Sequence, residues 1–212
     1  MAPLGRATWR ATGGLLDGLP VICGGYNDID KQIHSIAKDQ SKCLGQLSVR
    51  RNHAASVVLS NNTLWVTGGY DRQAKLKTTE LVTKDGKTSQ GPKLPLPLSS
   101  HSIVPLNSGA FILIGGAGGA GSDWSATHFY EEKKGWRPGP NLKNGRFRHS
   151  AGVLTDRVST KQYIVAVGGI YAESSLEYLE YPAYPGSNVW MKGKPTHSSL
   201  DQLQLESHLF MF

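Results

Sequence analysis

Three histidines recur at a constant interval and are the side chains best suited to bind a metal ion. His53, His101 and His149 are each 48 residues apart. If successive structural repeats place them around a common axis, three imidazoles would suit zinc or copper. The alternative is structural, because a histidine at the same place in every repeat can anchor the same turn through a hydrogen bond. The sequence favours this structural role, and we predict no bound metal and no cofactor.

A glycine-rich segment offers the second candidate chemistry. Residues 116–121 fit the G-x-G-x-x-G pattern of dinucleotide-binding loops and follow an apolar run. That chemistry requires a helix to begin directly after the loop, so that its N-terminal amides meet the pyrophosphate. Residues 122–130 are instead strand-like in composition, and Lys134-Gly135 soon interrupts them. We therefore predict a loop between two strands here and no nucleotide site.

Motifs for nucleophilic catalysis are absent from the sequence. It contains no G-x-S-x-G, C-x-x-C or H-E-x-x-H pattern. Cys23 lies in an apolar run, where cysteine commonly acts as a small hydrophobic residue. A disulfide between Cys23 and Cys43 is the alternative. The sequence predicts a protein that is not an enzyme, with an oxidase or hydrolase as the alternative function.

The elements that position these residues come from a fourfold repeat. An apolar run that ends in two glycines occurs at residues 20–25, 64–69, 111–116 and 164–169. The intervals are 44, 47 and 53 residues. A period near 50 is typical of repeat architectures. Thr79 and Thr127 keep the same step, as do Thr88 and Trp136.

Each repeat predicts four short strands. The first strand begins near the histidine, and the second is the apolar run, which is typical of a strand buried on both faces. The third strand covers residues 76–82, 127–131 or 176–179, and the fourth lies at Thr88, Trp136 or Trp190. Glycine at the end of the second strand permits a positive φ and a close backbone approach. No segment shows a long helical period, so the predicted fold class is all-β.

The chain resembles the kelch-repeat family. The resemblance covers residues 12–193 and rests on the apolar run with its glycine pair, on a downstream aromatic residue and on a later tryptophan. The aromatic residues are Phe129, Tyr130 and Tyr178, and the tryptophans are Trp136 and Trp190. The resemblance implies a kelch-type β-propeller of about four blades, each of four antiparallel strands. The blades are expected at 12–48, 49–94, 95–142 and 143–193, with an N-terminal leader at 1–11 and a divergent C-terminal tail at 194–212.

Some repeats depart from the family pattern. Blade one has no tyrosine or tryptophan signature before Arg50, blade two has Thr88 where the tryptophan belongs, and Leu98 takes the place of an arginine in blade three. Members of the family usually close with five to seven blades. We expect an incomplete ring, with closure as four blades or assembly with a second copy as the alternatives. An incomplete ring leaves a blade face and a strand edge open to association.

The resemblance also implies a non-enzymatic module that binds a protein or peptide through its loops. The loops that join second to third strands contain Tyr26, Asn27, Asp28, Tyr70, Asp71, Arg72, Trp124, Ile170 and Tyr171. The segments that lead into the next blade contain Arg50, Arg51, Arg146 and Arg148. Aromatic residues and arginines make strong anchors, and several arginines at one face favour an acidic motif. The alternative for each arginine is structural, since it can hold an adjacent blade through carbonyl groups.

Composition narrows the partners further. The net charge of +7 and the pI near 9.4 fit a solvated surface or an acidic partner. We do not predict nucleic acid as a partner, because the chain has no block of five basic residues and no aromatic-basic motif. The chain has no apolar run of 18 residues and no secretory signal, so we predict a cytoplasmic protein without a membrane span. A role as an adaptor for ubiquitin ligases, or in binding actin, is implied by the resemblance only, and an inactive fragment is a further alternative.

Overall fold

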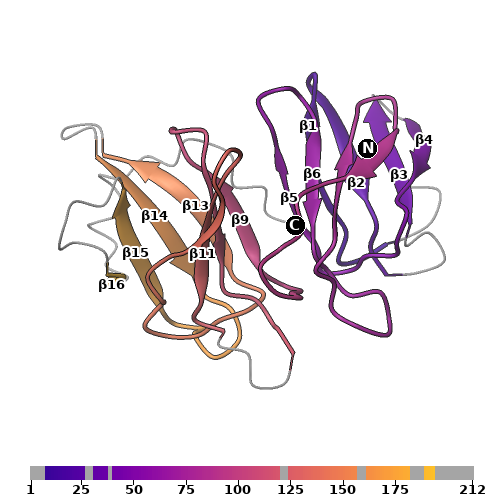
Figure 1. The fold of residues 1–212 in the computed structure, drawn as a ribbon. Helices are drawn as coiled ribbons and strands as arrows, with labels where there is room; N and C mark the ends of the chain where they lie inside the picture. Colours follow the sequence, from indigo (N-terminus) through magenta and orange to yellow (C-terminus); the bar gives the residue numbers. More distant parts are fainter. Residues whose placement is uncertain are drawn as a thin grey trace. The chain divides into compact units, whose positions relative to one another are not determined.

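The computed structural model describes residues 8–26, 31–37, 40–119, 124–156, 161–181 and 189–193, and these form sixteen β-strands and no helix (Figure 1). Blade one comprises β1 (Thr12–Leu16), β2 (Leu19–Cys23), β3 (Gln32–Ala37) and β4 (Gln40–Gln46). Blade two comprises β5 (Ala55–Val58), β6 (Leu64–Thr67), β7 (Thr79–Val82) and β8 (Thr88–Gln90). Blade three comprises β9 (Ser102–Pro105), β10 (Phe111–Ile114), β11 (Thr127–Glu131) and β12 (Gly135–Pro138). Blade four comprises β13 (Ser150–Thr155), β14 (Gln162–Val167), β15 (Leu176–Tyr181) and β16 (Met191–Gly193).

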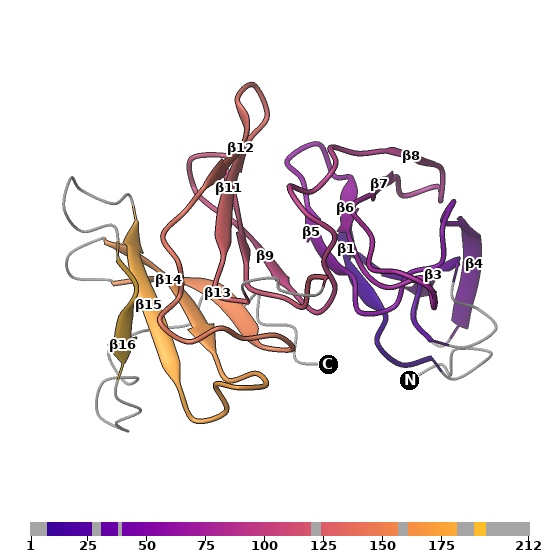
Figure 2. The ribbon, with the colours of Figure 1, turned by 60° about the horizontal axis from the view of Figure 1, so that its bottom comes forward.

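Each blade is an antiparallel meander whose strands pair in chain order (Figure 2). The four sheets fall within the predicted ranges 12–48, 49–94, 95–142 and 143–193. Blade one has all four strands although its sequence lacks the aromatic signature. The blade extends into the predicted leader 1–11, because Trp9 forms a bridge with Tyr26. The described residues include no helix that is long and apolar enough to cross a membrane.

The chain divides into two compact units, each with its own core. Unit 1 comprises Met1–His101 and Gly118–Ser122 and holds blades one and two. Unit 2 comprises Ser102–Ala117 and Asp123–Phe212 and holds blades three and four. The core of unit 1 contains Leu16, Val21, Cys23, Ile33, Leu47, Leu64, Val66 and Val82. The core of unit 2 contains Val104, Leu106, Ala110, Ile112, Ile114, Phe129, Leu142, Ile164, Ala166, Leu179 and Trp190. Burial of these side chains between two blades is the main stabilisation of each unit.

In blades one to three, the glycine pair connects the blade to the segment that enters the next one. The second glycine donates its N–H to a carbonyl of that segment, in the bonds Gly25 N to Arg51 O (2.8 Å), Gly69 N to Leu98 O (2.8 Å) and Gly116 N to Arg146 O (2.9 Å). Both members of each pair have a positive φ, which is costly for residues with a side chain. A Cβ on Gly115 would also lie only 2.5 Å from the carbonyl oxygen of Arg146. The close approach therefore requires glycine at this position.

A buried ion pair holds the entry segment of blade two. Arg51 Nε lies 2.9 Å from Glu80 Oε1, and the two side chains are 1% and 2% exposed. Arg51 also donates to the carbonyls of Gly68 and Thr78, each at 2.8 Å. Glu80 accepts the backbone N–H of Ser48 at 2.7 Å, so its carboxylate joins the third strand to the entry segment. These hydrogen bonds offset part of the desolvation cost of both charges, and burial still lowers the pKa of Arg51.

Blade four repeats the same arrangement. Arg146 Nη2 lies 2.6 Å from Glu177 Oε1, and neither side chain is exposed. Arg146 donates to the carbonyl of Gly168 at 2.9 Å, while Glu177 accepts the N–H groups of Lys143 at 2.6 Å and Asn144 at 3.0 Å. The prediction that Arg51 and Arg146 contact a partner is therefore corrected. Both guanidinium groups are buried and bind carbonyls and a carboxylate, which is the structural alternative.

Blade three lacks both members of this pair, and blade one lacks the glutamate. The strand register places His34 and His128 at the position of the glutamate, and Leu98 at the position of the arginine. A carboxylate buried without its cation is strongly destabilising. The two residues therefore occur together in blades two and four and are absent together from blade three.

The cysteines are both free thiols. Cys23 is buried on β2, and Cys43 is exposed on β4, where it donates to the carbonyl of Gly45 at 3.6 Å. Burial, with a smaller contribution from Glu80, raises the pKa of Cys23 to about 12.

We predict that the two members of the buried pair in blade four are strongly coupled, so that replacing both costs less than the sum of the two single replacements. Glu177→Gln or Arg146→Leu alone should lower the free energy of unfolding by about 3–5 kcal/mol, because one charge stays buried without a counter-charge. The double variant Arg146→Leu/Glu177→His copies blade three and should cost clearly less than the sum of Arg146→Leu and Glu177→His. Urea denaturation of the four variants measures this, and additive losses would contradict it.

We also predict two thiols of very different reactivity. Cys43 should react with a colourless thiol reagent within minutes at neutral pH, whereas Cys23 should react only after unfolding, because it is buried and protonated. The Cys43→Ser variant should then show no reactive thiol in the folded state and one in denaturant. Rapid reaction of that variant in its folded state would contradict the prediction.

Candidate partner-binding site

The three histidines that the sequence groups together do not occupy one structural position. His101 and His149 directly precede β9 and β13, whereas His53 lies two residues before β5. His53 instead shares a positive φ with Ser100 and Arg148, the residues at its place in blades three and four. The interval from His53 to His101 is therefore one residue longer than the distance between equivalent positions of blades two and three. The prediction that the three histidines are equivalent is wrong for His53.

His101 and His149 pack against the glycine pairs. A Cβ on Gly68 would lie 2.9 Å from His101 Cε1, and a Cβ on Gly115 would lie 3.1 Å from His149 Cε1. His101 Nε2 also lies 2.8 Å from Thr67 Oγ1. Burial lowers the pKa of His101 to about 4. Within the part of the chain that the structure describes, no three His, Cys, Asp or Glu side chains are grouped to hold a metal ion.

The glycine-rich segment joins β10 to β11 and has no helix in its described part. Gly116 has a positive φ as a member of its glycine pair, and Gly118 accepts a hydrogen bond from Lys75 Nζ. Residues 120–123 lie outside the described residues. The described part is therefore the loop between two strands that the sequence predicts.

An exposed aromatic surface lies at the second-strand end of blade one. Trp9 and Tyr26 stack with their ring centroids 5.6 Å apart and their planes 18° apart. Arg72, which is exposed, places its Cζ 5.1 Å from the centre of the Tyr26 ring. Trp9 is 58% exposed and Tyr26 38% exposed. We call Trp9, Tyr26 and Arg72 the unit 1 platform. Asn27 and Asp28, which the sequence places here, lie outside the described residues.

Hydrogen bonds within the loop hold Arg72 in place. The Tyr70 hydroxyl donates to the carbonyl of Arg72 at 3.0 Å. Asp71 Oδ1 accepts the N–H groups of Gln73 at 2.9 Å and Ala74 at 2.7 Å. The bond from Ala74 contributes most to lowering the pKa of Asp71, and the exposed Arg50 adds a smaller part. The predicted residues Tyr70 and Asp71 thus orient Arg72.

A second aromatic surface lies at the equivalent end of the blades in unit 2. Trp124 stacks on Tyr171 with centroids 4.8 Å apart and planes 10° apart. Phe147 meets both rings edge-on, at 5.6 Å from Trp124 and 5.8 Å from Tyr171. Arg148, which is exposed, places its Cζ 5.9 Å from the Phe147 ring centre. We call Trp124, Phe147, Tyr171 and Arg148 the unit 2 platform.

Both platforms contain a residue with an unfavourable backbone conformation. Arg72 has a φ of 80° and Tyr171 a φ of 70°, and Tyr171 is 62% exposed. A non-glycine residue in this region costs on the order of 1–3 kcal/mol, and such residues cluster at functional sites. The N–H of Tyr171 donates to Glu173 Oε1 at 3.2 Å, which helps to hold the ring outward.

The sequence misses two members of the platforms. Trp9 falls within the predicted leader 1–11. Phe147 lies between Arg146 and Arg148, which the sequence analysis selects in its place. Both directly precede a positive-φ residue at the same place in their blades, Arg10 and Arg148. Ile170, which the sequence also predicts at the contact surface, forms a backbone bridge with Phe147.

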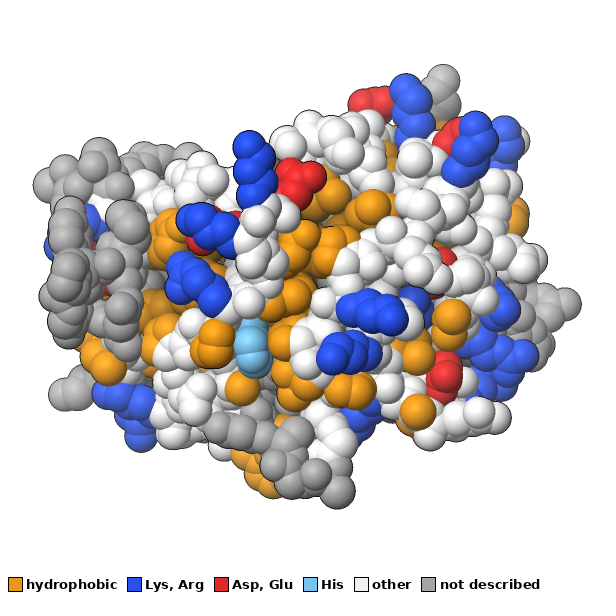
Figure 3. Space-filling model, viewed as in Figure 1, with side chains coloured by type: hydrophobic (Ala, Val, Ile, Leu, Met, Phe, Trp, Pro, Cys, Tyr) orange, Lys and Arg blue, Asp and Glu red, His pale blue; other side chains and the backbone are white. Residues whose placement is uncertain are grey.

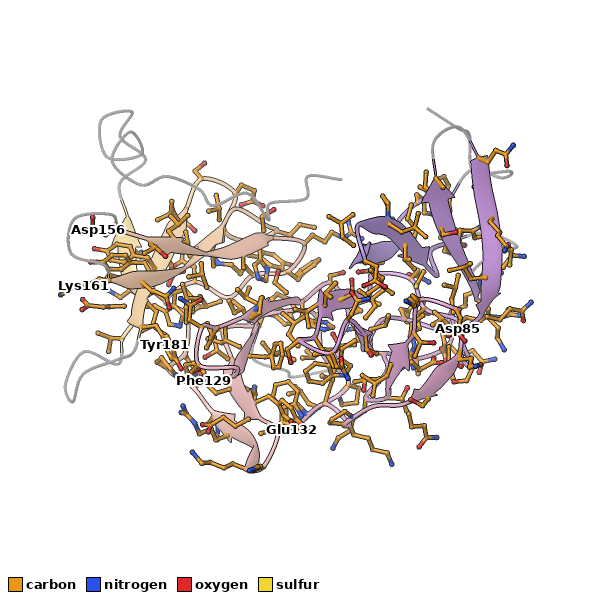
Figure 4. The ribbon with its side chains drawn as sticks, turned by 90° about the horizontal axis from the view of Figure 1, so that it is seen from above. Asp85, Phe129, Glu132, Asp156, Lys161 and Tyr181 are labelled. Carbon is orange, nitrogen blue, oxygen red and sulfur yellow. The ribbon has the colours of Figure 1, made fainter. Side chains whose placement is uncertain are left out.

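The platforms can bind flat or apolar groups together with negative charge. Exposed aromatic faces bury large apolar areas on contact, and guanidinium groups form directed bonds to carboxylates. On the face drawn in Figure 3, Lys and Arg side chains are more prominent than Asp and Glu and lie among hydrophobic ones. The opposite, hairpin ends of the strands in unit 2 carry charged residues such as Glu132, Asp156 and Lys161 (Figure 4).

Comparison with known proteins identifies the fold. The solved structure of a protein called YjhT is similar, with a TM-score of 0.71, and the match covers 93% of this chain and 68% of that chain. The two sequences are 13% identical, so the likeness concerns the fold alone. No family model and no curated protein matches the chain. The four four-stranded meanders are blades of the β-propeller type.

We predict that His101 makes stability depend on pH. The unfolded side chain binds a proton near its ordinary pKa of 6.5, whereas burial delays protonation of the folded one to about pH 4. Stability should therefore fall as the pH drops from 6.5 to 4, by on the order of 3 kcal/mol from this group. Urea denaturation of the wild type and of His101→Gln over this range measures the difference. Parallel pH profiles for the two proteins would contradict the prediction.

Proposed function

We propose that this chain is a portion of a kelch-type β-propeller that acts as a non-enzymatic adaptor and binds a protein or peptide with an acidic motif. The observation that carries the proposal is the unit 2 platform, in which Tyr171 keeps an unfavourable φ of 70° while it stacks on Trp124 in an exposed position. Three rings beside the exposed Arg148 make a surface suited to an apolar side chain flanked by carboxylates.

The unit 1 platform supports the same function. Arg72 lies over the exposed ring of Tyr26, so a ligand carboxylate could bond the guanidinium while an apolar neighbour contacts Trp9. The nearby carboxylate of Asp71 is bound to N–H groups of its own loop. The positive balance of the chain adds long-range attraction for an acidic partner.

The cytoplasm is the compartment that we propose. The free thiol of Cys43 is exposed, and the reducing cytoplasm keeps such thiols intact.

Arg50 is also part of the proposed contact surface. Its side chain is exposed, and in addition to the larger effect of the Ala74 N–H its charge lowers the pKa of Asp71, which lies beside Arg72.

Binding to a peptide array tests this function. The array holds peptides in which an aromatic or aliphatic residue is flanked by Asp and Glu, together with the same peptides carrying Asn and Gln or Lys and Arg. We expect the acidic set to bind. Arg72→Glu, Arg148→Glu and Tyr171→Ala should each weaken the best peptide about tenfold or more, as expected for anchor residues.

The matched control is Lys133→Glu. It makes the same change in charge at the exposed hairpin after β11, at the far end of blade three. If this control weakens binding as much as Arg148→Glu, only net charge matters and the platform is not the site. Equal binding of the Asn and Gln peptides would refute the acidic motif.

A further inference from the structure

The two units use the same pair of blade faces. In unit 1, β2 of blade one places Val21 and Cys23 against Leu64 and Val66 on β6 of blade two. In unit 2, β10 of blade three places Ile112 and Ile114 against Ile164 and Ala166 on β14 of blade four. These residues occupy matching positions relative to the glycine pairs. We call the face of a blade that carries Val21 and Cys23, or their equivalents, the leading face. The opposite face of the blade, which carries Leu64 and Val66 or their equivalents, is the trailing face. In both units a trailing face covers a leading face.

The leading face of blade four is apolar and partly open. It carries Val165 and Val167, the equivalents of Ile112 and Ile114. Val165 is 8% exposed and Val167 is 46% exposed, so the open part of the face lies at the Val167 end. Tyr163 and Tyr178 lie on the same face, with ring centroids 5.8 Å apart. The corresponding face of blade three is part of a closed core, with Ile112 and Ile114 completely buried.

The trailing face of blade one is also open. Its strands carry Leu15 and Pro20, the equivalents of Val58 and Leu64 in blade two, according to the strand registers. Leu15 is 41% exposed and Pro20 is exposed, whereas Leu64 is completely buried. Blade one therefore presents the kind of face that covers a leading face in both units.

One pair of glycines shows where the contact is missing. Gly14 lies on the leading face of blade one, and a Cβ there would meet Val58 Cγ2 at 2.7 Å and Leu64 Cδ1 at 2.9 Å. Gly152 holds the same register position in blade four, opposite Val165 as Gly14 is opposite Val21. Among the residues that the structure describes, a Cβ on Gly152 would meet nothing within 4 Å. The space above Gly152 thus matches the space that Val58 and Leu64 fill above Gly14.

We propose that the leading face of blade four binds the trailing face of blade one of a second copy of this chain. Leu15 and Pro20 of that copy then fill the space above Gly152, as their equivalents do above Gly14. Every copy offers one face of each kind, so the contact is head-to-tail and either closes between two copies or continues. The contact buries apolar side chains that a single copy leaves exposed.

Native mass spectrometry of the full chain over a series of concentrations tests this assembly. The wild type should have at least twice the 23.0 kDa mass of one chain. Gly152→Arg should be a monomer because the long side chain occupies the docking space, and Val167→Glu should act in the same way. Leu15→Glu, on the other face, should also be a monomer. The control Val189→Arg changes a residue that is 59% exposed and outside the named strands, and it should assemble like the wild type.

A mixing experiment distinguishes this contact from non-specific association. Gly152→Arg keeps an intact trailing face and Leu15→Glu keeps an intact leading face, so their mixture should form a pair of two chains and nothing larger. Melting curves confirm that each variant is folded. A wild type that is monomeric at all concentrations, variants that keep the wild-type mass, or a mixture that stays monomeric would each overturn the proposal.

Discussion

A single arginine ties the glycine pair of one blade to that of the next, and the rest of each unit depends on this connection. The carbonyl of Arg146 accepts the N–H of Gly116, and its guanidinium donates to the carbonyl of Gly168. Arg51 connects Gly25 and Gly68 in the same way. The bonds set the distance between neighbouring second strands, whose apolar residues form the cores. Because Phe147 and Arg148 directly follow Arg146, the same connection also positions the unit 2 platform.

The buried charge explains why the repeats are unequal. A guanidinium in this place needs several acceptors. Glu177 supplies the opposite charge, and the carbonyls of Gly168 and Ser175 accept further hydrogen bonds from Arg146. Blade three keeps the glycine bond to a carbonyl but uses Leu98, which needs no counter-charge. The backbone connection is thus common to the blades, and the ion pair is added where both residues are present.

The sequence predicts the strands well because their signals are local. The apolar run, the glycine pair and the turn residues lie within a few positions of one another, and the four sheets appear where the repeats place them. Whether an arginine side chain is buried or exposed does not depend on neighbouring residues in the sequence alone. Arg51 is buried because Glu80 lies 29 residues further on, whereas Arg50 beside it is exposed. For the same reason Trp9 could not be recognised, since its stacking partner Tyr26 comes from another strand end. His53 is wrongly grouped with His101 and His149, because the interval of 48 residues between His53 and His101 differs by one residue from the distance between equivalent positions in these two blades.

The two proposed contact surfaces use different parts of a blade. The platforms lie at the strand ends, where loops leave the sheet, whereas docking of a second copy uses sheet faces. The platform residues, such as Tyr171 and Arg72, are therefore different from the docking residues Gly152 and Leu15. An assembly of copies would present each platform more than once, so a partner that carries repeated acidic motifs would gain affinity through avidity without new contacts at any one site. A partner with one motif would bind a single chain and the assembly with the same affinity.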